Sequence, residues 1–328
     1  MLRYISHRVL MMIPMLIGIS LVSFLVIELP PGDFVSYRIA IMESGGASVE
    51  QATIDALRNQ YGLDLPLYRR YLRWAGNVLR GDFGLSFTYN KPVKELIWER
   101  LALTVVISLT TLLFTWVIGF FVGIYSATHQ YSLGDYAFTA MSFVGVGIPD
   151  FLIAIVILWF GYSWFGVSLS GLFSQEFASA PWSWAKFLDM LKHLWLPLLV
   201  LGVGGTAGMI RTMRANVLDE LHKPYVITAR AKGLKETRLL LKYPVRVALN
   251  PFVSSIAWAL PRLISGATII SVVMSLPTTG PLLLGALRAQ DMYLASTFLL
   301  LLSVLTLIGT LISDILLAWL DPRIVYGE

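Results

Sequence analysis

Side chains that commonly carry catalysis are scarce in this 328-residue chain. It contains no Cys, which excludes a disulfide framework, a thiol nucleophile and a thiolate metal site. Its four His residues lie in loops or near the ends of apolar stretches, and none belongs to a His-Glu-x-x-His motif. A Ser–His dyad inside the membrane would therefore have no evident base. This pattern argues against an intramembrane protease and predicts no catalytic and no metal site.

Nucleotide chemistry has equally little support. No Gly-x-x-x-x-Gly-Lys-Ser/Thr motif occurs, so the chain does not cradle ATP phosphates in a P-loop. The glycine-rich run 202–208 has no strand before it and no Lys after it, and it lies inside an apolar stretch. Small residues in such a place allow helices to pack closely. We therefore predict helix packing at this run.

Ionisable residues at membrane depth are the remaining candidates for chemistry, because ion-coupled transporters place such residues near the middle of the bilayer. The nearest are Glu28, Asp150, Arg262 and Asp314. Glu28 and Asp150 fall at the edges of apolar stretches, and the four form no evident relay. Structural pairing is the expected role of each, and an ion-coupled secondary transporter stays open as an alternative.

The most informative polar segment is Tyr225-Val-Ile-Thr-Ala-Arg-Ala-Lys-Gly233. It predicts a short helix that begins after the break at Lys223-Pro224 and stops at Gly233. Further helices are expected over 215–222 and 236–249. The surrounding 211–250 loop holds nine Lys or Arg and three acidic residues. Such a loop suits the docking of a cytoplasmic partner or the binding of anionic lipid.

Long apolar helices must position these segments. Hydrophobic residues make up 56% of the chain and charged residues 14%, with a mean hydropathy of +0.71, whereas soluble domains carry about a quarter charged residues. About 20 apolar residues cross a bilayer as a helix. Six stretches qualify, which predicts an all-α integral membrane protein with spans near 9–29, 101–125, 137–161, 194–213, 252–275 and 294–320.

The charge of the loops sets the orientation, because Lys and Arg gather on the cytoplasmic side. The N-terminal tail carries Arg3 and Arg8, and the 211–250 loop is strongly basic. Six crossings then place both termini and this loop in the cytoplasm. Basic residues elsewhere are few and dispersed, which argues against nucleic-acid binding.

This orientation divides the chain into four regions. Residues 1–29 form a retained first helix, since Leu29-Pro-Pro-Gly32 is not a signal-peptide cleavage site. Residues 30–100 form an external cap with helices over 49–61 and 67–79. Residues 101–320 form a five-helix core that contains the 211–250 loop, and residues 321–328 form a C-terminal tail. The cap is expected to pack on the helix ends and also suits the docking of an external partner.

Four separated motifs resemble those of one family. In chain order they are Pro31-Gly-Asp33, Gly81-Asp-Phe-Gly-Leu-Ser86, Tyr225-Val-Ile-Thr-Ala-Arg-Ala-Lys-Gly-Leu234 and Asp314-Ile-Leu-Leu-Ala-Trp-Leu-Asp-Pro-Arg-Ile324. They are similar to motifs of the inner-membrane permease subunits of ABC importers, in the dipeptide, oligopeptide and nickel branch. Their order and spacing also agree, so the resemblance covers essentially the whole chain.

The resemblance implies a type I ABC importer permease fold in a bacterial or archaeal cytoplasmic (inner) membrane. This chain and a homologous, non-identical second permease would form the pathway. Two ABC ATPase subunits would bind ATP and Mg at the cytoplasmic face, and a periplasmic or lipid-anchored solute-binding protein would deliver the substrate. The chain itself would be a transport subunit without cofactor. Peptides are the expected substrates, with oligosaccharides and nickel complexes as alternatives.

The resemblance also implies which residues act. Contact with the ATPase would fall on Glu220, Tyr225, Ala229, Arg230, Lys232 and Gly233, where small residues permit close approach and charged ones fix orientation. The pathway would run between the third and fifth spans, with Ser265 and Thr268 as candidate lining residues. The general importer signature begins Glu-Ala-Ala. Here Ile227 and Thr228 replace its first two residues, while Ala229 and Gly233 keep its register.

Overall fold

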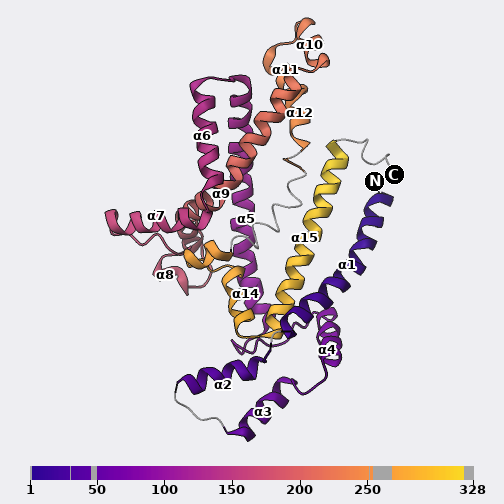
Figure 1. The fold of residues 1–328 in the computed structure, drawn as a ribbon, viewed down its shortest axis with the longest axis vertical. Coiled ribbons are helices and arrows are strands. Elements are labelled where there is room, and N and C mark those ends of the chain that lie inside the picture. The colour runs from indigo at the N-terminus through magenta and orange to yellow at the C-terminus, as the bar shows by residue number, and fades with distance from the viewer. Residues whose placement is uncertain (1, 30, 46–49, 251, 254–267, 321–328) are drawn as a thin grey trace. The chain divides into compact units, whose positions relative to one another are not determined.

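The computed structural model describes residues 2–29, 31–45, 50–250, 252–253 and 268–320 (Figure 1). Over these residues the chain is helical and forms no strand; a single isolated bridge joins Leu85 and Pro92. The chain divides into two compact units, one of residues 1–104 and 278–308 and the other of residues 105–277 and 309–328.

The first unit joins the N-terminal helix to the helices of residues 30–100, the predicted external cap. It contains α1 (Leu2–Glu28), α2 (Phe34–Ser44), α3 (Gln51–Tyr61), α4 (Leu67–Leu79), the start of α5 (Val93–Thr128), α14 (Thr279–Arg288) and the start of α15 (Met292–Leu320). Local signals set several helix ends. Asp33 caps α2 by accepting from Ser36 N at 2.7 Å, and Gly62 ends α3 in the left-handed conformation.

Aromatic packing holds the cap helix α4 against α1 and α15. Trp74 is 1% exposed and packs with Phe24, Phe34 and Met292. Its indole nitrogen donates a hydrogen bond to Thr297 Oγ1 at 3.3 Å. The expectation that the cap packs on the ends of long helices is therefore met within this unit.

The Gly81–Ser86 motif has a structural role in the same unit. Gly84 has φ +77°, and a Cβ on it would lie 2.9 Å from the Tyr293 ring. Ser86 Oγ donates to Asp291 Oδ2 at 2.6 Å, and Asp291 also accepts from Thr88 N. Asp291 is fully buried beside the first turn of α15. The motif thus fixes the turn before α5 against the start of α15.

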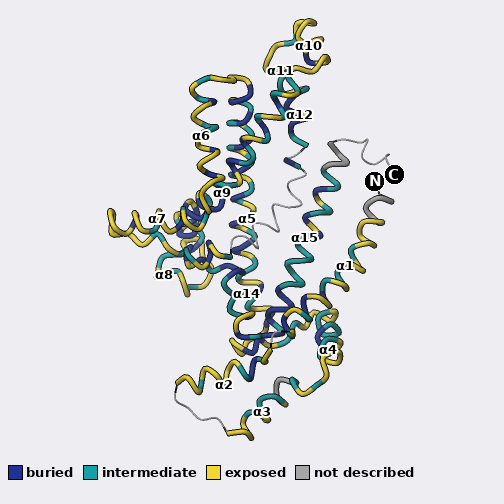
Figure 2. Tube along the Cα trace, in the orientation of Figure 1, coloured by how far each residue is buried: buried dark blue, intermediate teal, exposed yellow. Residues whose placement is uncertain are grey.

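The second unit carries the basic segment. It contains the remainder of α5 and α15, together with α6 (Leu133–Gly147), α7 (Asp150–Phe165), α8 (Gln175–Ala178), α9 (Trp184–Leu221), α10 (Pro224–Ala231), α11 (Glu236–Lys242) and α12 (Pro244–Ala248). Figure 2 shows α7 as largely exposed, whereas α9 is buried along much of its length. In this unit α9 is the central helix, against which α6, α7 and α12 pack.

Glycines allow α9 to approach its neighbours, as the run 202–208 predicts. A Cβ on Gly202 would lie 2.9 Å from the Phe114 ring of α5. The same surface includes Gly119 and Gly123 of α5, whose added Cβ atoms would lie 2.6 Å from Met209 Cβ and 2.5 Å from Met213 Cβ. The prediction of helix packing at this glycine-rich run is confirmed.

Four predicted spans correspond to single helices that are long and apolar enough to cross a membrane: Ser6–Glu28, Val93–Thr128, Trp184–Leu221 and Met292–Leu316. The predicted span over 137–161 is not a single helix, but α6 and α7 together are long and apolar enough to cross a membrane as a bent pair. Here α6 and α7 meet at 99°, because Pro149 cannot continue a helix and biases Ile148 towards extended backbone. The predicted 252–275 span and the 321–328 tail lie largely outside the described residues.

The predictions for shorter helices had mixed outcomes. The helix over 67–79 is confirmed as α4, and that over 49–61 as α3 with a slightly later start. A separate helix over 215–222 is wrong, because α9 runs without interruption to Leu221. The helix over 236–249 is divided into α11 and α12 at Pro244. Helices α2 and α14 were not predicted.

Candidate functional site

The segment from α10 to α12 builds a compact basic projection at the end of α9. Pro224 occupies the first turn of α10, where its missing N–H costs no helical hydrogen bond. Gly233 ends the helix with φ +76°. Gly233 N donates to Arg230 O at 3.0 Å and Leu234 N donates to Ala229 O at 3.3 Å. These two bonds form a Schellman motif, which confirms the predicted helix and its glycine stop.

A small apolar core holds α10 against α11. Val226 and Leu239 are fully buried and Ala229 is 6% exposed, with Leu234 and Tyr243 packed around them. The side chain of Ala229 therefore points inwards, and its small size allows α10 to approach α11. Ala229 was predicted among the residues that contact a partner, whereas its side chain lies in the apolar core of the segment.

Two polar pairs fix the ends of α10. The Tyr225 hydroxyl donates to Glu220 Oε2 at the end of α9. Arg230 donates through Nε and Nη2 to Glu236 at 3.2 and 2.5 Å, which ties the end of α10 to α11. The bond from Arg230 lowers the pKa of the Glu236 carboxyl, and the same bond raises the pKa of Arg230. Glu236 was missed, because no helical periodicity links it to Arg230 across the glycine turn.

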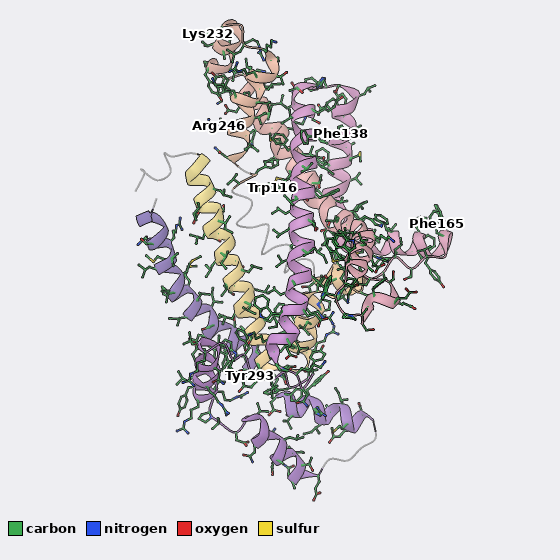
Figure 3. The ribbon with its side chains drawn as sticks, turned by 180° about the vertical axis from the view of Figure 1, so that it is seen from behind. Trp116, Phe138, Phe165, Lys232, Arg246 and Tyr293 are labelled. Carbon is green, nitrogen blue, oxygen red and sulfur yellow. The ribbon has the colours of Figure 1, made fainter. Side chains whose placement is uncertain are left out.

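The outer face of α10 is open to a partner. Tyr225 is 42% exposed and Ile227 is 56% exposed, and Thr228 and Lys232 are also exposed. Figure 3 shows Lys232 at the far tip of the projection. The structure thus brings the six predicted residues together around one helix. Glu220, Tyr225 and Arg230 make contacts that orient the helix, and Tyr225 and Lys232 also lie at its surface.

The projection is continuous with α9. The backbone of α9 is helical from Trp184 to Leu221. On its last turns, Met213 and Val217 are fully buried against Val245 and Ala248 of α12 and against Phe252. The projection is therefore joined to α9 twice, by the chain itself at Leu221 and by packed side chains at α12.

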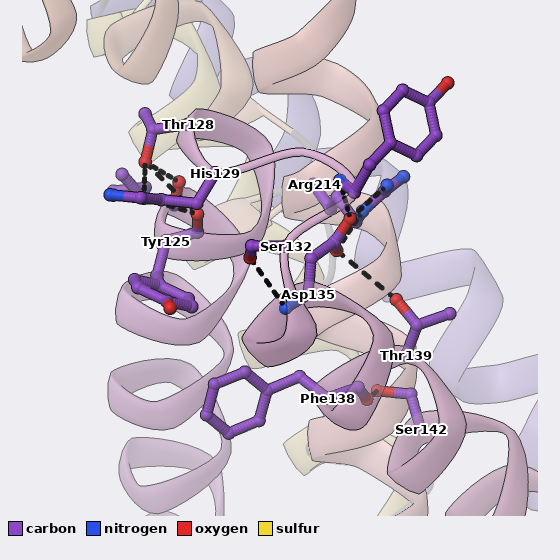
Figure 4. A network of polar contacts seen from close by, with 11 residues as sticks. Tyr125, Thr128, His129, Ser132, Asp135, Phe138, Thr139, Ser142 and Arg214 are labelled. Atoms are coloured by element: carbon purple, nitrogen blue, oxygen red, sulfur yellow. Dashed lines mark hydrogen bonds and ion pairs between the residues drawn. The ribbon is translucent and has the colours of Figure 1, made fainter.

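A buried ion pair joins α9 to α6 close to this packing (Figure 4). Arg214 Nε and Nη2 donate to the two carboxylate oxygens of Asp135, each at 2.7 Å. Asp135 is 2% exposed and also accepts from Tyr131 N at 3.0 Å. The sequence analysis did not single out Asp135. An acidic residue in a turn that lacks Lys and Arg is the only local signal, and it does not identify the partner.

The predicted pathway residues and ionisable residues lie elsewhere. Thr268 is half-buried on a helical turn, while Ser265 and Arg262 lie outside the described residues. Glu28 pairs with Arg70 at 2.6 Å, which confirms its expected structural role. Asp150 Oδ1 would lie 3.1 Å from a Cβ added at Gly204 of α9, so the carboxylate sits against that helix. Within the described ranges, no group of three or more His, Asp or Glu side chains is arranged to hold a metal ion.

The comparisons with known proteins point one way. The family model of the binding-protein-dependent transport system inner membrane component matches residues 119–326, and the model of the N-terminal part of such membrane components matches residues 1–110. The chain is 36% identical to the oligopeptide transport system permease protein AppB of Bacillus subtilis over 99% of this chain and 100% of that protein.

Other relatives carry different substrate names. The chain is 31% identical to the glutathione transport system permease protein GsiC of Escherichia coli, over 99% of this chain and 100% of that protein. It is 30% identical to the peptidoglycan transport system permease protein YejB of Agrobacterium fabrum, over 98% of this chain and 97% of that protein. Among solved structures, the MetNI methionine ABC transporter in inward-facing conformations matches with a TM-score of 0.53 and 17% identity, covering 70% of this chain and 97% of that chain.

Proposed function

Because the chain belongs to the family of binding-protein-dependent transport system inner membrane components, we propose that it forms half of the pathway through which an ATP-driven importer takes up peptides. It is a multi-pass inner-membrane permease subunit. The names of its relatives support peptides as the substrate class, since they include an oligopeptide and a glutathione permease. Oligosaccharides and nickel complexes stay as alternatives within the same machinery.

The observation that carries the proposal is the construction of α10. A helix of eight residues is closed by a Schellman turn, tied to α9 through Tyr225 and Glu220, and presents Ile227 and Lys232 outwards. The fixed orientation favours a rigid docking element over a flexible loop. We assign this element to an ABC ATPase subunit, which supplies the ATP-binding motif that the sequence of this chain lacks.

The geometry supports a lever mechanism. When the two ATPase subunits close on ATP and Mg, they displace α10 on each permease. The displacement passes into α9 because the backbone is helical up to Leu221 and α12 is packed against Met213 and Val217. The Arg214–Asp135 pair then moves α6 together with α9. The long helices tilt and open the pathway outwards, and hydrolysis resets them.

The remaining partners follow from the same assembly. A second, homologous and non-identical permease chain completes the pathway, as the resemblance of the four motifs implies. A solute-binding protein delivers the substrate at the external cap, where Tyr68 and Leu72 of α4 are exposed. Ser265 and Thr268 stay proposed as residues of the pathway.

Co-purification tests the proposal directly. The chain is expressed together with the products of its neighbouring genes, as wild type and as Gly233→Arg, and the purified material is assayed for ATP hydrolysis in nanodiscs. The wild type is expected to retain an ATPase pair, and the variant is expected to lose it or its stimulated turnover. A wild-type chain that carries no ATPase and moves solute down an ion gradient would favour the secondary transporter.

A further inference from the structure

The exposed side of α11 differs in chemistry from the exposed side of α10. Lys235, Arg238 and Lys242 line an open depression of about 550 Å³ together with Thr237 and Leu241. Leu241 is 58% exposed, and the opposite side of the helix is anchored by the fully buried Leu239. The face is therefore cationic with an exposed apolar side chain. On α10, by contrast, Tyr225, Ile227 and Thr228 are exposed, its one cation Arg230 is paired with Glu236, and Lys223 and Lys232 stand only at its two ends.

The cations on this face are not matched by acids of the same segment. Glu236, the acidic residue of α11, is occupied by Arg230, and Glu220 is occupied by the Tyr225 hydroxyl. Lys242 instead lies 5.4 Å from the centre of its neighbouring Tyr243 ring. The third acid of the 211–250 loop, Asp219, lies on α9, and none of the ion pairs among the described residues includes Lys235, Arg238 or Lys242. The depression therefore carries positive charge that suits an anionic ligand.

The position of α11 indicates where that ligand is. The 38 residues of α9 extend about 57 Å, which exceeds the roughly 30 Å of the hydrocarbon core. Arg211 is the first cation after the apolar part of α9. Val245 and Ala248 of α12, which directly follows α11, pack on Met213 and Val217, so the chain after α11 returns along the turns of α9 that come just after Arg211.

We propose that this face of α11 binds the headgroups of anionic phospholipids in the cytoplasmic leaflet, with Arg238 and Lys242 as phosphate contacts and Leu241 inserted at the acyl boundary. Exposed Lys and Arg beside an apolar residue at the membrane surface suit such lipids. The orientation rests on the proposed function, which places the segment in the cytoplasm. The lipid contact would hold the base of the projection while α10 stays free for the ATPase.

A label on the face tests this proposal without any ATPase. The chain has no Cys, so Thr237→Cys carries a single fluorophore in the full-length protein in nanodiscs. Nanodiscs of phosphatidylcholine with increasing phosphatidylglycerol also contain a lipid with a headgroup quencher. Quenching is expected to rise with phosphatidylglycerol and to fall at high salt. The same label at Ile227→Cys, on α10, is expected to respond much less.

Matched charge removals identify the contact. The double variant Arg238→Gln/Lys242→Gln is expected to weaken the phosphatidylglycerol dependence of quenching by about fivefold per charge at low salt. The matched double variant Lys223→Gln/Lys232→Gln is expected to leave that dependence unchanged. Equal loss in both variants, or no dependence on phosphatidylglycerol, would overturn the proposal. A response reproduced by inorganic phosphate in neutral nanodiscs, or a face protected only when ATPase is added, would also overturn it. ATPase co-purification is read separately, so failure of the lipid site leaves the proposed function standing.

Discussion

Gly233 decides where α10 ends and how its carbonyl groups are satisfied. Its φ of +76° lies in the region that glycine adopts without steric cost, and no atom lies within 4 Å of an added Cβ. A side chain at this position would therefore act through the backbone and not through a clash. The conformation allows Leu234 to fold back on Ala229 and close the apolar core of the segment.

Gly233→Ala is expected to cost about 1–2 kcal/mol, since the left-handed conformation becomes unfavourable, and to weaken ATPase binding by the corresponding factor. Titration of the reconstituted permease with purified ATPase measures this factor. Gly208→Ala serves as the control, because this helical glycine has no atom within 4 Å of an added Cβ and Ala favours a helix. Equal losses in the two variants would contradict the role assigned to the Gly233 turn.

The Arg230–Glu236 pair makes the end of α10 sensitive to acid. Because the pKa of Glu236 is lowered by the bond from Arg230, its contribution is present above the ordinary carboxyl pKa and is lost as pH falls through the lowered value. Both side chains are about half exposed, so the contribution is about 0.5 kcal/mol. A spin label at Ala231→Cys should gain mobility below pH 4.

The matched variant for this prediction is Glu236→Gln. It should show the mobile signal already at pH 7 and should not change further on acidification. High salt should bring the wild type part of the way towards the variant, since exposed pairs are screened. Identical pH profiles for the wild type and Glu236→Gln would show that the pair does not order the end of α10.

At the scale of helices, α6 and α9 are joined by the Asp135–Arg214 pair. Asp135 is buried but the Arg214 side chain is 25% exposed, so breaking the pair is expected to cost about 1–3 kcal/mol, less than the ~3–5 kcal/mol of a fully buried pair. We expect Asp135→Ala to destabilise the purified protein by roughly this amount, measured by thermal unfolding in detergent. Asp135→Asn with Arg214→Gln should recover part of the loss, because no unpaired charge remains. If the double variant is as unstable as the sum of the single variants, the pair is not coupled.

The contact between α5 and α9 also depends on a glycine, here because a side chain would not fit. A Cβ on Gly123 would lie 2.5 Å from Met213 Cβ, an atom close to the backbone that cannot move aside. Gly123→Ala should therefore separate the helices locally and cost about 1–3 kcal/mol. Gly147→Ala, with no atom within 4 Å of its added Cβ, is the control. Unchanged stability of Gly123→Ala would contradict the close packing.

The bend between α6 and α7 shows what hydropathy alone misses. The stretch 137–161 is apolar apart from Thr139, Ser142 and Asp150, so composition favours one continuous helix. The break follows from Pro149, whose local effect overrides the apolar pattern. By contrast, α4 and α10 were predicted closely, because Pro66, Pro224 and Gly233 mark their ends in the sequence itself.

For the whole molecule, contacts between residues that are close along the sequence can be predicted, and contacts between residues that are far apart along the sequence cannot. Tyr225 and Glu220 are five residues apart, and their proximity could be expected from the chain. Asp135 and Arg214 are 79 residues apart, and Ser86 and Asp291 are 205 apart. Such pairs depend on the packing of helices, which one sequence without helix pairing does not reveal.

The two compact units carry different parts of the proposed function. The first contains the proposed external cap, with Leu72 exposed on α4, and the second contains α10, with Ile227 exposed. If the chain couples an external binding protein to cytoplasmic ATPases, these two positions must meet different partners on opposite sides of the membrane.

Site-specific photo-crosslinking in the assembled transporter tests this most directly. A photo-reactive amino acid is placed at Ile227 in one variant and at Leu72 in another, and the crosslinked partners are identified by mass spectrometry. Position 227 is expected to capture the ATPase, and position 72 is expected to capture the solute-binding protein and never the ATPase. Absence of ATPase adducts at 227, or their appearance at 72, would contradict the assignment of α10 as the ATPase docking helix.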